Sequence, residues 1–265
     1  MHINLKGLVV ISLLSMSSVF AAPKPPTELK IDSKVALASV MALSDQHIES
    51  VEVSLRLLAQ TGDAQSGEWE KIRGTLATAA SANVEALYWF ALPDGTYWSV
   101  QKGKEPGNLK DRAYFPKLLQ GKTVRGDLVV SKSTGKSVAI VAVPVLQKEK
   151  VIGVLGASIY LDKLSALIEK QMALESTMIF YSFDSQPLVG LNWDPAVIFA
   201  DPMKLGSEVS TAFKEMLTKD EGSVEYTFRG KKRTVLFKKS ARMGWWYAFG
   251  LIPEGREKPD SHVSG

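Results

Sequence analysis

Apolar positions follow two different periods along the chain, and the change from one period to the other marks the predicted elements. Between Ser33 and Gln60, apolar residues recur every three or four positions, with Ile48, Val51, Leu55 and Leu58 on one stripe. This spacing predicts a single amphipathic helix. At 1.5 Å per residue such a helix is about 40 Å long, so we expect it to pack along a two-part body or against a second copy of itself.

After a second helical segment the period becomes that of strands. Two aromatic-rich runs flank a tight turn and predict a hairpin, and a short helix then leads into three strands at hairpin spacing, followed by a further helix. The predicted elements are helix Trp69–Ala82, strands Ala86–Leu92 and Thr96–Val100, helix Ala113–Leu119, strands Arg125–Val130, Ser137–Leu146 and Val151–Ser158, and helix Leu161–Met172. This order predicts an α+β module with a five-stranded antiparallel sheet.

The rest of the chain repeats this order in a smaller form: a hairpin, a helix and three strands. Its predicted elements are Thr177–Phe183, Leu188–Leu191, Ser207–Thr218, Ser223–Phe228, Lys232–Lys239 and Trp245–Leu251. Two successive modules with one element order indicate an internal duplication at the level of fold, although no residue-level repeat accompanies it.

The first 21 residues are typical of an export signal. A weakly positive start and an apolar run lead to Val19-Phe20-Ala21, whose small residues suit signal peptidase. The run is shorter than the roughly 20 residues that a membrane span needs, so we expect cleavage after Ala21 over an uncleaved anchor. Residues 22–31 form a Pro/Lys linker and residues 254–265 a polar, flexible tail.

The composition agrees with export to the bacterial periplasm. The chain has 265 residues, 45% of them hydrophobic and 23% charged, and no Cys. It therefore has no disulfide framework and no thiol chemistry. The net charge of +4 comes from basic residues scattered among 28 acidic ones, and no nucleic-acid recognition motif is present, so we expect no nucleic-acid partner.

Candidate catalytic chemistry is sparse. The three His residues, His2, His47 and His262, lie far apart in the sequence and predict neither a catalytic triad nor a metal site. The segment Ser133–Ser137 resembles the end of a phosphate-binding loop, but Val130 stands where that loop needs Gly. We expect no enzyme activity, no cofactor and no metal; a carboxylate pair or a Ser-Lys dyad stays open as the alternative.

The stretch Asn108–Phe115 points to ligand binding instead. Arg112 can bind a carboxylate through two parallel hydrogen bonds, and Tyr114 follows it. We expect Asn108 and Asp111 to hold the loop. The preceding hairpin carries five aromatic residues. We expect one or two of them to line a cavity, and the candidates are Trp89 and Tyr97. The alternative is that Arg112 pairs on the surface with Asp111 or Asp127.

An ordered set of motifs is similar to a known family. These motifs are Asn108–Phe115, Ser133–Lys136, Val143–Val145, Val151–Gly156 and Tyr160–Leu164. Together they resemble the double Cache domain (dCache_1 type), an extracytoplasmic sensor of bacterial chemoreceptors and histidine kinases. The resemblance implies a long N-terminal helix, residues 32–65, that supports two stacked PAS-like modules with antiparallel sheets: a membrane-distal type module, residues 66–172, and a smaller one, residues 173–253.

The resemblance also implies a ligand pocket in the first of these modules. In the amino-acid-binding branch of the family an Arg holds the ligand carboxylate and an Asp holds the ammonium; Arg112 matches the first, whereas Ser158 occupies the place of the Asp. The predicted ligand contacts are Arg112, Tyr114, Ser158, Trp89, Tyr97, Val129 and Ser131. Since an ammonium would lack a partner here, we expect a small carboxylate. An amino acid or amine, or a structural or interaction protein with a self-filled pocket, remain the alternatives.

The resemblance has consequences for partners as well. Sensors of this family continue into a membrane span, whereas this sequence stops shortly after the second module. It resembles a freestanding form, which would pass its ligand state to a separate inner-membrane sensor kinase, chemoreceptor or cyclase, or act as a scavenging binding protein. A homodimer through the N-terminal helix is a further expectation.

Overall fold

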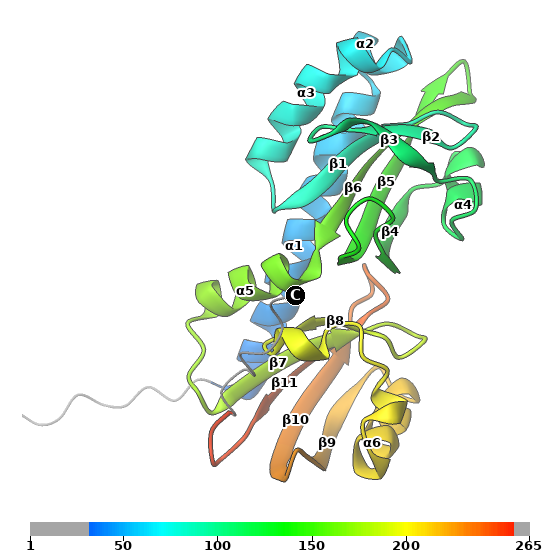
Figure 1. Cartoon of the computed structure of the whole chain (residues 1–265). Coiled ribbons are helices and arrows are strands. Elements are labelled where there is room, and N and C mark those ends of the chain that lie inside the picture. The colour runs from blue at the N-terminus through cyan, green and yellow to red at the C-terminus, as the bar shows by residue number, and fades with distance from the viewer. Residues whose placement is uncertain (1–31, 257–265) are drawn as a thin grey trace, which may run out of the picture. The chain divides into compact units, whose positions relative to one another are not determined.

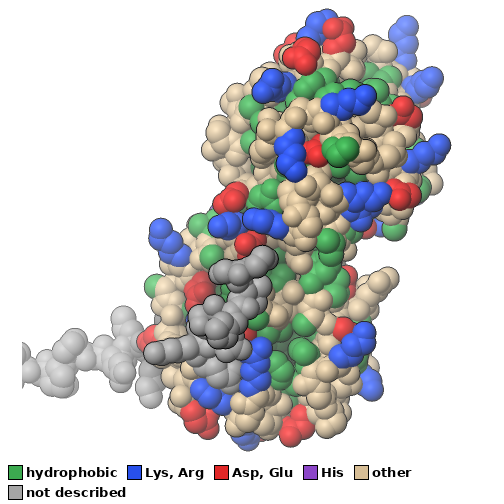
Figure 2. All heavy atoms as spheres, in the orientation of Figure 1, with side chains coloured by type: hydrophobic (Ala, Val, Ile, Leu, Met, Phe, Trp, Pro, Cys, Tyr) green, Lys and Arg blue, Asp and Glu red, His purple; other side chains and the backbone are tan. Residues whose placement is uncertain are grey.

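A computed structural model describes residues 32–256 of the chain (Figure 1). The predicted signal peptide and linker, and most of the predicted tail, lie outside the described residues. Within 32–256 no helix is both long and apolar enough to cross a membrane. On the face seen in Figure 2, acidic and basic side chains are interspersed.

The long N-terminal helix is confirmed as α1, Ser33–Ala59. The side chain of Asp32 caps its first turn by accepting a 2.7 Å hydrogen bond from the backbone N–H of Lys34, which satisfies one of the free N–H groups of that turn. Of its predicted apolar stripe, Ile48, Val51 and Leu55 are fully buried, and Leu58 is half-buried. A short helix, α2 (Gly62–Gln65), and α3 (Trp69–Ala82) follow.

The first sheet has six antiparallel strands in the order β3-β2-β1-β6-β5-β4. Their bounds are β1 Ala86–Ala91, β2 Thr96–Ser99, β3 Gly103–Asn108, β4 Val124–Val130, β5 Ser137–Gln147 and β6 Lys150–Tyr160, with helix α4, Phe115–Leu119, between β3 and β4. The prediction of five strands was wrong, because the sequence of β3, Gly-Lys-Glu-Pro-Gly-Asn, lacks β-branched residues. As an edge strand, β3 tolerates Pro106, which cannot donate to a ladder.

The aromatic residues of the hairpin are divided between the two faces of this sheet. Tyr88 and Phe90 belong to the same core cluster as the buried residues of α1 and α3, and Trp98 stacks on Trp69 with ring centroids 6.4 Å apart. Trp89 and Tyr97 belong to a second cluster on the other face, together with residues of the segment that follows β3.

The second module repeats the sheet-and-helix plan, as expected. After α5 (Leu161–Met172), five antiparallel strands pair in the order β8-β7-β11-β10-β9. Their bounds are β7 Met178–Phe183, β8 Val189–Asn192, β9 Glu221–Phe228, β10 Lys231–Lys239 and β11 Trp246–Leu251; the 3-10 turns η1 (Pro195–Val197) and η2 (Pro202–Lys204) and helix α6 (Ser207–Leu217) lie between β8 and β9. Phe213 of α6 packs against Phe183 at 4.7 Å between ring centroids, which places α6 on one face of the sheet.

Helix α1 contacts both sheets. At the second sheet Asp45 accepts hydrogen bonds from Tyr247 (2.9 Å) and Ser240 (2.6 Å). At the first sheet the buried Glu52 accepts from Arg125 of β4, with 2.7 Å between Arg125 Nη2 and Glu52 Oε1. Because α1 packs against both sheets, its buried positions extend along the helix from Ala36 to Ala59.

Candidate functional site

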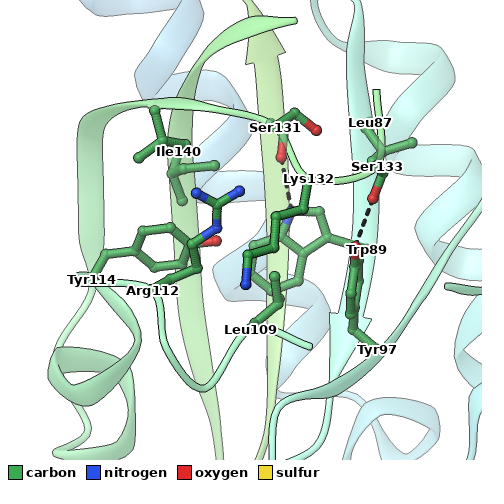
Figure 3. A pocket seen from close by; sticks show the side chains of 12 residues that line it. Leu87, Trp89, Tyr97, Leu109, Arg112, Tyr114, Ser131, Lys132, Ser133 and Ile140 are labelled. Carbon is green, nitrogen blue, oxygen red and sulfur yellow. Dashed lines mark hydrogen bonds between the residues drawn. The ribbon is translucent and has the colours of Figure 1, made fainter. Parts of the chain in front are cut away.

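A cavity of about 20 Å³ lies on the face of the first sheet that carries Trp89 and Tyr97. Strands β1, β2, β4, β5 and β6 contribute to it, together with the segments before α4 and after β4. The lining residues are Leu87, Trp89, Tyr97, Leu109, Arg112, Tyr114, Val129, Ser131, Lys132, Ser133, Ile140 and Ser158. All seven residues that the sequence analysis proposed as ligand contacts are among them. Figure 3 shows Arg112 and Lys132 side by side, with Trp89 and Tyr97 next to them.

The sheet register explains how distant residues meet at this cavity. Ser158 of β6 pairs with Leu87 of β1 on one side and with Ile140 of β5 on the other, so all three side chains point to one face. Trp89, two residues beyond Leu87, donates a 3.2 Å hydrogen bond from Nε1 to Ser158 Oγ. Sequence reasoning missed Leu87, Leu109, Lys132, Ser133 and Ile140, because only this register and the fold of the loops bring them to the cavity.

Arg112 is held by the backbone rather than by an acid. Its side chain donates a 2.8 Å hydrogen bond from Nη2 to the carbonyl oxygen of Val130. Its Nε atom is buried and has no hydrogen-bond partner among residues 32–256. The two acids that were considered as its surface partners bind lysines instead: Asp111 pairs with Lys132, and Asp127 pairs with Lys117 at 3.2 Å. Part of the guanidinium is therefore left to bind another acceptor.

The loop that carries Arg112 is fixed by its own polar residues. The side chain of Asn108 accepts from the N–H of Lys110 (2.8 Å) and donates to the carbonyl of Asp94 (3.1 Å). Lys132 donates to the carbonyl of Asn108 at 3.0 Å and to the carboxylate of Asp111. Asn108 and Asp111 thus hold the loop, as their positions in the sequence suggested.

The loop between β4 and β5, residues 131–136, is bonded across the cavity; we call it the 131–136 loop. On one side Lys132 connects it to Asn108 and Asp111. On the other side the hydroxyl groups of Ser133 and Tyr97 are hydrogen-bonded at 2.7 Å, and Lys102 Nζ donates to the carbonyl of Ser133 at 2.8 Å. These polar contacts close the 131–136 loop over the site.

The lining of the cavity contains two cationic residues, Arg112 and Lys132, and no acidic residue. The pKa of Tyr114 is raised by burial, which outweighs the nearby positive charge of Arg112. Burial also raises the pKa of Tyr97, aided by the charge of Glu105 and opposed by the hydrogen bond with Ser133. Both phenols are therefore neutral at physiological pH and can act as hydrogen-bond donors.

The volume of the cavity limits what it holds in this state. A cavity of about 20 Å³ takes about one water molecule, whereas pockets for organic ligands usually measure roughly 300–1,000 Å³. An organic ligand needs the site to widen. Residues 131–133 of the 131–136 loop line the cavity, and the loop is joined to its surroundings by the hydrogen bonds of Lys132 and Ser133.

No model of a known protein family matches the chain. The chain is 26% identical over 169 residues to the methyl-accepting chemotaxis protein PscA of Pseudomonas syringae pv. tomato; the match includes 61% of this chain and 27% of that protein. The chain thus spans about a quarter of the length of this curated relative.

Solved structures share the fold over most of the chain. The ligand-binding domain of the Pseudomonas aeruginosa amino acid chemoreceptor PctB, in complex with L-Arg, matches with a TM-score of 0.64 at 14% identity, over 84% of this chain and 95% of that one. The ligand-binding domain of the Pseudomonas fluorescens chemoreceptor CtaA, with L-isoleucine, matches with a TM-score of 0.61 at 14% identity, over 84% and 92%.

The sensory domain of the Campylobacter jejuni chemoreceptor Tlp3, with isoleucine bound, matches with a TM-score of 0.59 at 15% identity, over 84% of this chain and 90% of that one. All three are sensory domains of chemoreceptors, and all three share with this chain the N-terminal helix and the two antiparallel sheets. The chain therefore has the double Cache fold of chemoreceptor ligand-binding domains.

Proposed function

We propose that the first module is a small-molecule sensor and that its ligand is a small organic anion whose carboxylate binds Arg112. The observation that carries this proposal is the buried Nε of Arg112, which has no partner among residues 32–256, in a cavity lined by two cationic residues and no acid. Leaving such a donor unsatisfied is costly. A carboxylate would supply the missing acceptor, and the neutral hydroxyls of Tyr114 and Ser158 would complete its hydrogen bonds.

Ligand entry requires the 131–136 loop to open, since the closed cavity has a volume of about 20 Å³. The hydrogen bonds that Ser133 and Lys132 make across the cavity involve polar groups that water can solvate in an open state. In the closed structure Lys132 binds Asp111, and with a ligand present it would exchange this carboxylate for that of the ligand. This couples the position of the loop to occupancy.

Thermal unfolding against a panel of compounds tests the proposal. Acetate, propionate, pyruvate and lactate represent small carboxylates, and alanine, isoleucine and arginine represent amino acids. A compound at 100 times its dissociation constant should add about 2.7 kcal/mol to the free energy of unfolding. Arg112→Ala should abolish the response, whereas Arg73→Ala, which removes an exposed arginine from α3, should retain it. An equal response of both variants would overturn the proposal.

An amino acid is the second candidate ligand, and it is favoured by the bound L-Arg and isoleucine of the structures with this fold. Against it stands Ser158, which lines the cavity where the resemblance calls for Asp. The panel separates the two ligand classes: a response to alanine or isoleucine that exceeds the response to propionate would replace the carboxylate with an amino acid.

A structural or interaction protein is the third candidate, favoured by the small volume of the cavity. In that case the side chains of Trp89, Tyr97 and Tyr114 fill the site permanently. No compound of the panel would then change the unfolding temperature, and Arg112→Ala would alter stability alone.

We also propose that the protein acts in the periplasm and passes its ligand state to a separate membrane protein. On α1, Val35, Val53 and Leu57 are apolar and exposed, with 59%, 41% and 63% of their surfaces accessible. A second copy or a helix of a membrane partner could cover them. Chromatographic sizing of the chain from residue 22 distinguishes a homodimer from a monomer, and Leu57→Lys should shift a dimer towards the monomer.

A further inference from the structure

The second module contains a buried arginine that the proposed sensor site does not use. Arg233 of β10 is 5% exposed. Its Nε and Nη2 atoms are both buried and have no hydrogen-bond partner within residues 32–256. A guanidinium always carries its charge in proteins, and a buried charge without a partner strongly destabilises a fold. Burial raises the pKa of the Tyr226 phenol, and a hydrogen bond from Arg233 acts to lower it. Tyr226 thus supplies one neutral acceptor, but the two buried nitrogens still need acceptors.

The surroundings of Arg233 supply rings and hydroxyl groups. Its guanidinium carbon lies 4.6 Å from the centroid of the Phe228 ring, a favourable cation–π distance. Tyr226 is its cross-strand partner on β9. The hydroxyl of Tyr226 donates to that of Tyr181 at 3.1 Å. Both tyrosines, like Arg233, are buried. None of these groups carries a negative charge.

Two acidic residues of this module bind other basic residues. Asp194 binds Arg229 at 2.9 Å. Glu225, the neighbour of Tyr226 along β9, binds Lys232 at 2.7 Å. Tyr181 has a donor to spare, because its present acceptor is the thioether sulfur of Met216 at 3.9 Å, and sulfur accepts hydrogen bonds only weakly. Two guanidinium nitrogens therefore lack an acceptor, and a phenol has only a weak one.

The position of Arg233 parallels that of the cavity in the first module. In the register of the second sheet, Arg233, Val235 and Phe237 share one face of β10, and Tyr226 and Val224 share that face on β9. Tyr181 stacks on Phe213 of α6 at 5.5 Å, so this is the face that α6 covers. Tyr247, which binds Asp45 of α1, alternates to the opposite face. In both modules, therefore, an arginine and two tyrosines lie on the face turned away from α1.

We propose that Arg233 forms an anion site in the second module and that the site takes a small monovalent anion, either a halide or the carboxylate of a very small acid. The anion accepts from Arg233 Nε and Nη2 and from the Tyr181 hydroxyl. It must be small, because Phe228 and Tyr226 lie directly against the guanidinium. Occupancy would make the stability of this module depend on the anion present.

Thermal unfolding at constant ionic strength tests the proposal, with sodium gluconate replaced stepwise by sodium chloride or by sodium acetate. Gluconate is too large for the site, and the chloride and acetate series separate an inorganic from an organic anion. Each series is recorded for the wild type, for Arg112→Ala, which removes the proposed sensor site, and for Arg233→Gln. Lys232→Gln serves as the matched control, since it removes a charge from the neighbouring position on the opposite face of β10.

The unfolding temperatures of the wild type, Arg112→Ala and Lys232→Gln should rise by several degrees as chloride or acetate replaces gluconate, and that of Arg233→Gln should not. In gluconate alone, Arg233→Gln should unfold at the same or a higher temperature than the wild type, because it removes an unpaired buried charge. Parallel responses of the wild type and Arg233→Gln would overturn the proposal. The proposal would also be overturned if Arg233→Gln were less stable than the wild type by the same amount in all three salts. That result would indicate that water, and not an anion, solvates Arg233.

A second measurement does not depend on a folded variant. The chloride-35 resonance of a chloride solution should broaden on addition of the wild type and of Arg112→Ala, and acetate should reverse the broadening if both anions share the site. If neither protein broadens the resonance, chloride does not bind. If, in addition, acetate raises the unfolding temperature of Arg233→Lys as much as that of the wild type, Arg233 is not the anion site.

Discussion

Gly156 lies directly opposite Trp89 in the β1–β6 ladder, and the indole ring of Trp89 covers the place where a side chain at position 156 would stand. A Cβ atom at Gly156 would lie 2.2 Å from that ring. The indole forms one wall of the cavity and donates to Ser158. The missing side chain of Gly156 is therefore what allows the cavity its aromatic wall.

Gly156→Ala should consequently destabilise the protein and close the site. The added methyl group forces the Trp89 ring out of its rotamer, and overpacking of this kind costs about 1–3 kcal/mol. Urea unfolding measures the loss, and the carboxylate panel should give no shift. Gly74→Ala, in α3, is the control: its Cβ would have no atom within 4 Å, so a gain of about 0.5–1 kcal/mol is expected. Unchanged stability of Gly156→Ala would contradict the packing of Trp89 described above.

Ser158→Asp should change the preferred class of ligand. An aspartate at this position would add the missing acid to a cavity that Arg112 and Lys132 line, and a zwitterion could then satisfy both charges. Thermal-shift responses should move from propionate to alanine. Ser158→Asn is the control, because Asn has the size and shape of Asp but carries no charge. If Ser158→Asp retains the response to propionate and gains none to alanine, residue 158 does not select the ligand.

Asp111→Asn should make the 131–136 loop open more often. The ion pair of Asp111 with Lys132 is one of the contacts that close the loop, and the hydrogen bond from Lys132 lowers the pKa of this carboxyl. Stopped-flow tryptophan fluorescence, to which Trp89 in the cavity wall contributes, should report a several-fold faster association of the best carboxylate of the panel. High salt should accelerate the wild type but not the variant, because salt screens an exposed pair. Equal salt dependence in both proteins would mean that the ion pair does not control opening.

Glu52→Gln should remove a pH-dependent part of the stability. Burial by itself raises the pKa of Glu52, but the hydrogen bond and charge of Arg125 and the charge of Arg56 outweigh it, so the pKa is lowered. A carboxyl whose pKa is lower in the folded state stabilises the protein above its unfolded pKa, about 4.3, and this stabilisation is lost as pH falls through the folded pKa.

The free energy of unfolding of Glu52→Gln should therefore lie below that of the wild type by about 1.5–3 kcal/mol at pH 7. The difference should shrink as pH falls below about 4.3. Urea unfolding from pH 7 to pH 3 measures it, and Glu70→Gln, at an exposed position of α3, should show no such trend. A constant difference at all pH values would mean that Glu52 acts through packing alone.

Periodicity in the sequence determined the elements of the fold. The stripe of α1 and the strand runs of both modules are local patterns, and burial follows directly from them because a helix repeats every 3.6 residues and a strand every two. Two candidate ligand contacts, Arg112 and Tyr114, could also be proposed from the sequence, by their residue types and by the motif around them. Strand β3 escaped prediction because its pairing with β2, rather than its composition, makes it a strand.

Only the tertiary structure decided which side chains meet and how much space they leave. Leu87 and Ile140 reach the cavity through the register of Ser158 between two strands, and Lys132 reaches it through the course of a loop. The small volume of the cavity and the unpartnered nitrogens of Arg112 and Arg233 depend on three-dimensional packing. Such properties arise between residues far apart in the sequence, so no local pattern records them.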